Sequence, residues 1–240
     1  MSAGPPHGGE AGPGRPPRGQ LEDLVARGVD WGPWARQALR TQQDARPAAV
    51  LILLGALDGR PAHHPSPAVP QDLDVLLLGR SPALTHHPGQ VSFPGGRLDP
   101  GDDGPVAAAL REAVEETGLD RTGVDVLGTL APVPVPVSRH LVTPVLAWWA
   151  APSPVGVVDH AESSVVFRAP VADLIDPGRR RSATTYRGRP VGRTPAFLVD
   201  SLDGGAPHVV WGFTALLLDR VLDALGWAEP WDPSRTIEVP

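Results

Sequence analysis

The sequence predicts an α/β fold built around a mixed sheet, and three features of the 240-residue chain support this. Continuous apolar runs of strand length occur at residues 48–57 and 73–78. An alanine-rich helical pattern extends from Pro105 to Thr117. The later strand and helix patterns follow a mixed order that lacks the regular alternation of a doubly wound fold. A chain of this length can bury a sizeable core.

The N-terminal segment differs in composition from the rest of the chain. Gly and Pro occupy 11 of the first 20 positions, which predicts a disordered tail over residues 1–20. Residues 21–44 have helical spacing interrupted by Gly28 and by Gly32–Pro33, which predicts an extension of two short helices. We expect one folded domain over residues 45–228 and a C-terminal tail over residues 229–240.

The remaining elements follow from apolar patterning and breaker residues. Residues 59–71 are rich in Pro and His and predict a long loop. A closing helix is expected to end at Gly226, a favourable residue for a left-handed cap. The expected strands are 48–57, 73–78, 124–130, 141–149, 165–167, 184–187, 196–199 and 208–211, and the expected helical segments after Thr117 are 171–175 and 214–225.

Composition excludes several functional classes. The chain has no Cys, so it has no disulfide framework, thiolate metal site or Cys nucleophile. Its net charge of −6 argues against a general nucleic-acid binder. No apolar run approaches the length of a membrane span, and no signal-peptide core follows Met1, so we expect a soluble cytoplasmic protein.

The helix at 105–117 carries the most informative pattern. Glu112, Glu115 and Glu116 share one helical face, and Val106, Leu110, Ala113 and Val114 are expected to pack on the opposite face. The three carboxylates repel one another and lie at the helix end that disfavours negative charge. A hard divalent cation would offset this repulsion, whereas the simpler reading is a solvated face on which Arg111 pairs with a neighbouring glutamate.

The segment Pro94-Gly95-Gly96 precedes this helix, and at its two glycines the backbone carries no side chain. Carbonyl groups there can approach a metal ion, and N–H groups can approach a phosphate. A metal combined with a phosphate suggests displacement at phosphorus by an activated water.

Residues 96–119 resemble the Nudix box, G-x5-E-x7-R-E-U-x-E-E-x-G-U, in which U is aliphatic. Residues 111–119 match its second half at every fixed position. The first half departs from the pattern, because Gly96 lies one residue further from Arg111 than the box requires. Asp102 or Asp103 replaces the first glutamate.

The preceding residues resemble the additional motif of the coenzyme A pyrophosphatase branch, LLTxR[SA]x3Rx3Gx3FPGG. All spacings from Leu76 to Gly96 match. Two residues depart: Leu78 stands in place of the family's Thr, and Thr85 in place of its second Arg. His86 and His87 are the candidate replacements for that missing cation. The resemblance covers about residues 45–225, a span whose ends are defined only to within a few residues.

The resemblance implies a Nudix α/β/α sandwich with a loop–helix–loop catalytic motif. It implies metal-dependent hydrolysis of the coenzyme A or acyl-CoA diphosphate to 3′,5′-ADP and (acyl-)4′-phosphopantetheine, with Mg²⁺ or Mn²⁺ as cofactor. Arg111 would orient the glutamates, and Glu112 would be either a ligand or the general base. The implied metal ligands are Gly96, Glu112, Glu115 and Glu116, with Glu162 as a later acidic candidate, and the implied substrate contacts are Arg80, Ser81, His87, Gly95 and Gly96.

Two other functions stay open at this point. The Thr85 departure leaves room for another nucleoside diphosphate derivative such as ADP-ribose or NADH. A Nudix-fold binding module with weak catalysis is the second alternative, although such a module does not need all three glutamates. We expect a small-molecule substrate and no nucleic-acid or membrane partner, and a homodimer is an assembly that stays open. The run Arg179–Arg181 is either a receiver for the 3′-phosphate or a solvated loop.

Overall fold

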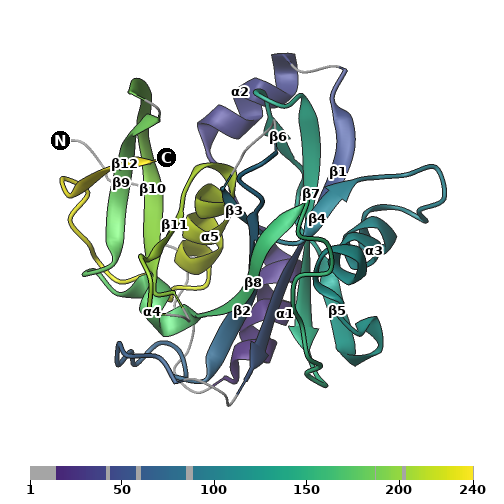
Figure 1. Cartoon of the computed structure of the whole chain (residues 1–240), viewed down its shortest axis with the longest axis horizontal. Coiled ribbons are helices and arrows are strands. Elements are labelled where there is room, and N and C mark those ends of the chain that lie inside the picture. The colour runs from purple at the N-terminus through teal and green to yellow at the C-terminus, as the bar shows by residue number, and fades with distance from the viewer. Residues whose placement is uncertain are drawn as a thin grey trace.

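The structure is a computed structural model that describes residues 15–41, 44–57, 61–84, 89–186, 188–201 and 204–239. Figure 1 shows two sheets on either side of a helical layer. The larger sheet has eight strands in the order β3-β2-β1-β7-β5, with β4 and β6 added beside β1 and β7 and β8 paired to β2. These strands are β1 (Arg46–Ala56), β2 (Leu73–Arg80), β3 (Val91–Ser92), β4 (Gly95–Arg97), β5 (Val124–Thr129), β6 (Val133–Val135), β7 (His140–Trp149) and β8 (Ser163–Pro170).

The large sheet is mixed because its central strand β1 has both parallel and antiparallel neighbours. Strand β1 runs parallel to β7 over nine residue pairs from Arg46↔His140 to Leu54↔Trp148, whereas its contacts with β2 and β4 are antiparallel. Both central strands are apolar along most of their length, so both faces of the sheet are covered. The predicted α/β class with a mixed sheet is therefore confirmed.

One face of the large sheet is covered by helix α3 (Pro105–Thr117), shown in teal in Figure 1. Ala108, Ala109 and Ala113 are fully buried and pack against Leu51 and neighbouring β1 residues. Small side chains let the helix axis approach the sheet closely. Val114, which the helical wheel places in the core, is instead 38% exposed.

The opposite face is covered by α1 (Pro17–Arg27), α2 (Pro33–Thr41), α4 (Val171–Ile175) and α5 (Gly212–Ala224). A single apolar cluster joins the buried residues of these helices to the inward face of the large sheet. Helix α5 also packs on the smaller sheet, which follows the order β11-β10-β9-β12. The strands are β9 (Arg180–Tyr186), β10 (Arg189–Val199), β11 (His208–Val210) and β12 (Thr236–Val239), and a short 3₁₀ turn, η1 (Arg121–Gly123), precedes β5.

The structure corrects both predicted tails. Residues 17–20 belong to α1, because Leu21 and Leu24 are fully buried and the helix that carries them begins at Pro17. At the other end, β12 pairs in parallel with β9, so this part of the predicted C-terminal tail belongs to the small sheet. Residues 1–14 of the predicted N-terminal tail lie outside the described residues.

The loop predicted at 59–71 is described from residue 61 and is tied to distant parts of the chain. The carboxylate of Asp173 accepts hydrogen bonds from the backbone N–H groups of His63 and His64, each at 2.8 Å. His64 Nε2 also lies 3.0 Å from a carboxylate oxygen of Glu229. These contacts join the loop to α4 and to the segment after α5. Among the described helices, none has the length and apolar character needed to cross a membrane.

Candidate active site

The glycine pair before α3 brings the box loop against the central strand. Gly95 lies opposite Val50 and Gly96 opposite Ala49 in the β1–β4 ladder. A Cβ at Gly95 would lie 2.3 Å from the Ala49 carbonyl oxygen, and Gly95 has a φ of 155°. Glycine is therefore required at this position for both space and backbone conformation.

The absence of a side chain at Gly96 leaves space for a glutamate, whereas at Gly95 it leaves space for the backbone of β1. A Cβ at Gly96 would lie 2.3 Å from Glu112 Oε1. The carboxylate of Glu112 thus lies directly against the Gly96 backbone. Burial raises the pKa of Glu112, an effect that Arg111 partly offsets. The predicted juxtaposition of Gly96 and Glu112 is present in the structure.

Glu116 reaches the same loop from one helical turn further along. Its Oε2 accepts a hydrogen bond of 2.9 Å from the backbone N–H of Gly95. Burial raises the pKa of Glu116 from 4.5 to about 7; the Gly95 N–H and Arg80 oppose this shift, and the charges of Glu112 and Glu162 add to it. Two carboxylates with raised pKa values therefore lie beside the glycine loop.

Arg111 connects the acidic residues of the loop and the helix. Its guanidinium donates to Asp102 at 3.0 and 3.1 Å, to Glu112 at 3.0 Å and to Glu115 at 3.0 Å. It also donates to the Arg97 carbonyl at 3.0 Å. The Asp102 hydrogen bonds contribute most to raising the pKa of Arg111, and the pKa of Asp102 is lowered mainly by Arg111. Arg111 thus holds the carboxylates of Asp102, Glu112 and Glu115 around one guanidinium.

The sequence left Asp102 and Asp103 as equal replacements for the first glutamate of the box. The structure selects Asp102, whose side chain is 6% exposed and bonded to Arg111. Its Oδ2 also accepts from the Asp99 backbone N–H at 2.8 Å. Asp99 itself lies 3.7 Å from the Arg111 guanidinium and was not among the predicted site residues. Only the turn at 99–102 brings Asp99 to this position, so sequence spacing gave no signal for it.

The donor set fits a divalent cation that takes oxygen ligands. Glu112, Glu116 and the Gly96 backbone supply oxygen atoms, and Glu112 and Glu116 carry mutually unfavourable charge in a buried setting. Within the described segments, no three acidic or His side chains converge as a complete ligand set. A cation held by few carboxylates, with water and substrate phosphate completing its shell, matches the habit of Mg²⁺.

Glu115 has a different setting from the other two glutamates. Its side chain is 56% exposed and it pairs with Arg111 one turn earlier. Glu112, Glu115 and Glu116 were predicted to share one helical face. Their burial agrees with this only in part, because Glu112 and Glu116 face the loop and Glu115 faces outward.

Two residues distant in sequence also reach the carboxylates. Arg80, at the end of β2, and Glu162, just before β8, both contribute to the pKa of Glu116. Arg80 lies opposite Ser163 in the β2–β8 ladder, which brings Glu162 to the same edge. Arg80 Nε is buried without a hydrogen-bond partner in the described structure.

Ser81 and His87 are the two remaining side chains among the predicted substrate contacts. Ser81 is 5% exposed, and its backbone N–H donates to the Glu162 carbonyl at 2.8 Å. This placement gives Ser81 a local structural contact and leaves it little surface for a substrate. His87, together with Thr85, lies outside the described residues.

The run Arg179–Arg181 is neither of the two things that the sequence suggested. Arg179 forms a bidentate pair with Asp200, at 2.7 Å for each bond. Arg180 is 1% exposed and pairs with Asp219, and Arg181 donates to the Gly178 and Arg180 carbonyls. These guanidinium groups bind parts of the fold at the start of the small sheet, so neither a solvated loop nor a phosphate receiver describes them.

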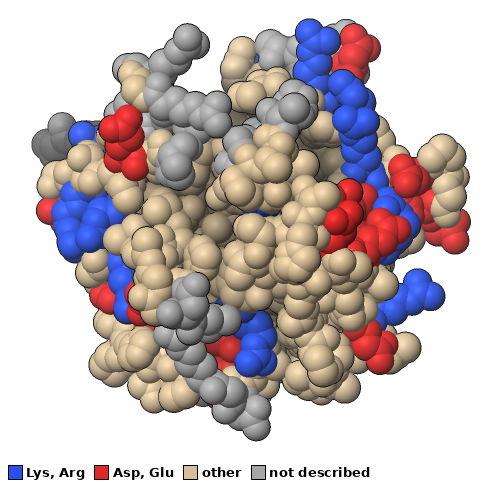
Figure 2. Space-filling view, in the orientation of Figure 1, with Lys and Arg blue, Asp and Glu red and all other residues tan. Residues whose placement is uncertain are grey.

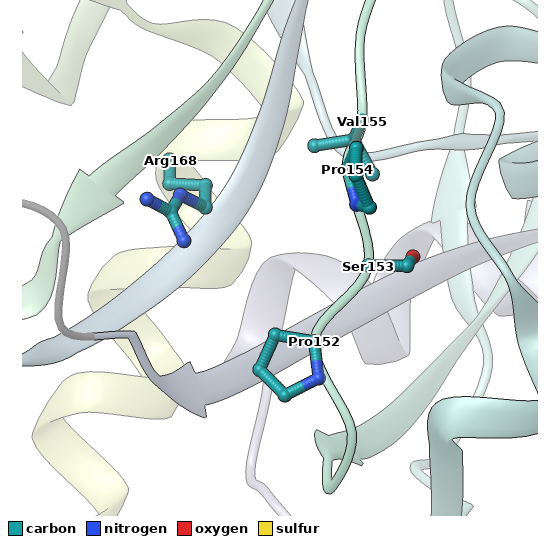
Figure 3. Close-up of a pocket in the computed structure, with 5 residues that line it drawn as sticks. All are labelled: Pro152, Ser153, Pro154, Val155 and Arg168. Carbon is teal, nitrogen blue, oxygen red and sulfur yellow. The ribbon is translucent and has the colours of Figure 1, made fainter.

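A separate pocket of 370 Å³ lies between residues 152–155 and Arg168 of β8. Figure 3 shows Arg168 on one side and the extended segment from Pro152 to Val155 on the other. Its lining contains one cation and no carboxylate. The acidic face bordering the glycine loop therefore carries the stronger case for phosphoryl chemistry.

The chain is similar to known proteins of one family. A family model described as the NUDIX domain matches residues 66–187. An uncharacterized Nudix hydrolase, NudL, of Escherichia coli strain K12 is 34% identical over 206 residues, which cover 86% of this chain and 95% of that protein. The NudL protein of Shigella boydii serotype 4 matches to the same extent.

Two solved structures were compared as well. The Nudix hydrolase RenU of M. smegmatis has 26% identity and a TM-score of 0.42, covering 55% of this chain and 74% of its own. A MutT/nudix family protein of Enterococcus faecalis has 15% identity and a TM-score of 0.43, covering 86% of this chain and 72% of its own. With a domain model over half of its length and a relative that it covers almost fully, this chain belongs to the Nudix hydrolase family.

Proposed function

We propose that this Nudix hydrolase cleaves the diphosphate of coenzyme A or an acyl-CoA. The products are 3′,5′-ADP and (acyl-)4′-phosphopantetheine. The observation that carries the proposal is the position of Arg80. This residue belongs to the motif upstream of the box, and its charge acts directly on Glu116. The coenzyme A-type motif and the Nudix box therefore contribute to one site.

The site residues have different roles in the proposed reaction. Glu116 and the Gly96 carbonyl would hold a divalent cation such as Mg²⁺ or Mn²⁺, with Glu115 and Glu162 at its margin. Glu112 would be either a further ligand or the general base. When bound, the cation polarises phosphoryl oxygens and lowers the pKa of a ligated water. Arg80 supplies a cation for a substrate phosphate. Arg111 orients Glu112 through a hydrogen bond of 3.0 Å.

The reaction is a hydrolysis in which the chain forms no covalent intermediate. A water oxygen bonds to one phosphorus, and the bridging P–O bond breaks. The bridging oxygen leaves with the other phosphate, and the water proton passes to a carboxylate, for which Glu112 is our candidate. The protein supplies position and electrostatics to this displacement.

The test is a hydrolysis screen with Mg²⁺ and with Mn²⁺. Its substrates are coenzyme A, acetyl-CoA, dephospho-CoA, ADP-ribose and NADH, with products resolved by mass. A Glu116→Gln variant purified in parallel reports contaminating activity. Preferential cleavage of coenzyme A to 3′,5′-ADP supports the proposal, and preference for ADP-ribose or NADH contradicts the substrate assignment.

The screen also separates the proposal from a binding module. Glu112, Glu115 and Glu116 of the box are retained, and Glu112 and Glu116 are held at the glycine loop, which favours catalysis. A protein that binds Mg²⁺ and coenzyme A but cleaves none of the five substrates would contradict an enzymatic role.

A further inference from the structure

The pocket between residues 152–155 and Arg168 opens on the same face of the large sheet as the box helix. Arg168 of β8 is paired with Leu76 of β2. Leu76 is buried in the apolar cluster that includes the alanines of α3. Because residues paired across two strands share a face, the Arg168 side chain lies on the face that α3 covers. Arg80 lies four residues after Leu76 on the same strand, and therefore on this face as well.

Two connections place this pocket close to the candidate active site. Four residues of a strand span about 13 Å, which is the separation of Leu76 and Arg80 along β2. The backbone N–H of Gly156 donates to the Thr117 carbonyl at 3.0 Å, and Thr117 directly follows Glu116. The segment that lines the pocket is thus bonded to the turn of α3 that carries Glu116. A part of the substrate that extends beyond the cleaved diphosphate can reach this pocket.

The wall of the pocket formed by residues 152–155 is rigid and largely apolar. Pro152 and Pro154 have fixed φ angles and no N–H group, and Val155 packs against the cluster beneath α3. Ser153 Oγ accepts a hydrogen bond of 3.2 Å from the Asp120 backbone N–H, which leaves the hydroxyl hydrogen available to a ligand. The cavity volume of 370 Å³ falls within the range of about 300–1,000 Å³ that is usual for small-molecule sites.

The charge of the pocket is opposite to that of the box. Figure 2 shows a group of acidic side chains on the side of the molecule where Figure 1 draws α3. The pocket lining instead has Arg168 as its one charged residue. Arg168 is half-buried, and in the part of the chain that the structure describes its guanidinium has neither an ion pair nor a hydrogen bond. A half-buried cation with unused donors favours an anionic ligand.

We propose that Arg168 and residues 152–155 bind the part of the substrate that carries a ribose phosphomonoester, with Arg168 on the phosphate and the proline-rich wall against the base. In coenzyme A this group is the 3′-phosphate, so the assignment rests on the proposed function. The diphosphate that is cleaved stays at Arg80 and the box carboxylates, about 13 Å away along β2.

The direct test is equilibrium binding of 3′,5′-ADP and of 5′-AMP, which differ only in the 3′-phosphate. We expect the wild-type protein to bind 3′,5′-ADP at least about tenfold more tightly, a preference that falls as salt is raised. Arg168→Ala should remove most of this preference, and Arg168→Lys should retain part of it. Arg40→Ala removes an exposed arginine of α2, on the opposite face of the large sheet, and serves as the matched control.

A kinetic measurement reports on the same subsite. In Arg168→Ala, KM should rise more for coenzyme A than for dephospho-CoA. The subsite is refuted if the wild-type protein shows no preference for 3′,5′-ADP, or if Arg168→Ala keeps that preference, even when coenzyme A is cleaved. If coenzyme A is not cleaved but the preference exists and depends on Arg168, the subsite stands and the proposed substrate fails.

Discussion

The carboxylate of Glu116 accepts a hydrogen bond from the backbone N–H of Gly95 at 2.9 Å, which joins two residues 21 positions apart. The contact connects the end of helix α3 to the glycine loop that pairs with β1. It also holds a buried carboxylate where the pKa is raised to about 7. Ionisation of this carboxyl is costly in the protein alone, and it becomes favourable once a cation is bound beside it.

The first prediction concerns the stability of the metal-free protein. Because the folded-state pKa of Glu116 exceeds its ordinary value, its contribution to stability is complete below pH 4.5 and is lost as the pH rises through about 7. A rise from 4.5 to about 7 corresponds to about 3 kcal/mol. The difference in unfolding free energy between wild type and Glu116→Gln, measured by urea titration, should decrease by that order between pH 4 and pH 8.

The control for this prediction is metal addition. Mg²⁺ at pH 8 should stabilise the wild type and have little effect on Glu116→Gln. A pH-independent difference between the two proteins would show that burial does not raise the pKa of this carboxyl.

Gly96→Ala should separate activity from stability. The added Cβ would meet the end of the Glu112 side chain, which can move aside, so the free energy of unfolding should change by less than about 1 kcal/mol. Displacing Glu112 by an ångström or more should lower kcat about 100-fold. Both quantities are measured on one preparation, by denaturant titration and by product formation.

Substitutions at two other glycines serve as comparisons for Gly96→Ala. Gly95→Ala meets the Ala49 carbonyl and should impair folding itself. Gly101→Ala meets nothing within 4 Å and should preserve both activity and stability. Wild-type kcat in Gly96→Ala would remove the role given to Glu112.

Arg111 is a positioning residue, and its substitution should act on turnover. Arg111→Lys keeps the charge but loses the planar fork that bonds Asp102 at two atoms. We expect kcat to fall at least about tenfold while KM changes little, because no substrate contact is removed. Arg111→Ala should also destabilise the fold, since both carboxylate oxygens of Asp102 lose their hydrogen-bond donor. Double-mutant cycles with Asp102→Asn measure this coupling, and additive effects would contradict it.

Helix α3 was predicted well because its signals are local. Pro105, the alanine run and Gly118 fix its limits, and the structure has the same limits with a left-handed Gly118 at φ 69°. The inward face was predicted less well, since Val114 is exposed while Thr117 is buried. Close approach to β1 favours the alanine side of the helix, a preference that hydrophobicity alone does not reveal.

Contacts between distant segments explain what the sequence did not reveal. β12 is a short segment that pairs with β9, about 50 residues earlier in the chain, and nothing in residues 229–240 indicates that pairing. The choice of Asp102 over Asp103 depends on which carboxylate the turn directs at Arg111. The approach of Glu162 to Arg80 depends on the β2–β8 register, which pairs Arg80 with Ser163. In each case the deciding partner lies elsewhere in the chain.

The buried charge of Arg180 should make Asp219 important for stability. The Arg180 guanidinium lies 4.2 Å from the ring of Phe197 and 4.6 Å from that of Trp231, and it pairs with Asp219. Burial lowers the pKa of Arg180. Asp219→Ala leaves this cation without its partner and should cost about 3–5 kcal/mol, whereas Arg180→Met with Asp219→Leu should cost much less.

The matched control for this pair is Asp223→Ala, which removes an exposed aspartate from the same helix. Thermal and urea unfolding of the four proteins give the comparison. A small loss in Asp219→Ala would mean that the aromatic rings alone hold the guanidinium.

Arg80 links the upstream motif to the chemistry, and its removal should affect substrate binding more than turnover. The guanidinium Nε has no hydrogen-bond partner in the described structure, while the Arg80 backbone N–H is fixed by the Gln90 carbonyl at 2.9 Å. Arg80→Ala should therefore raise KM for the cleaved substrate about tenfold and lower kcat less, with partial recovery in Arg80→Lys. Arg40→Ala, in helix α2 on the opposite face of the large sheet, is the control and should leave both constants near wild type. An unchanged KM in Arg80→Ala would show that this cation serves the fold rather than the phosphate, and the assignment of the upstream motif to substrate binding would fail with it.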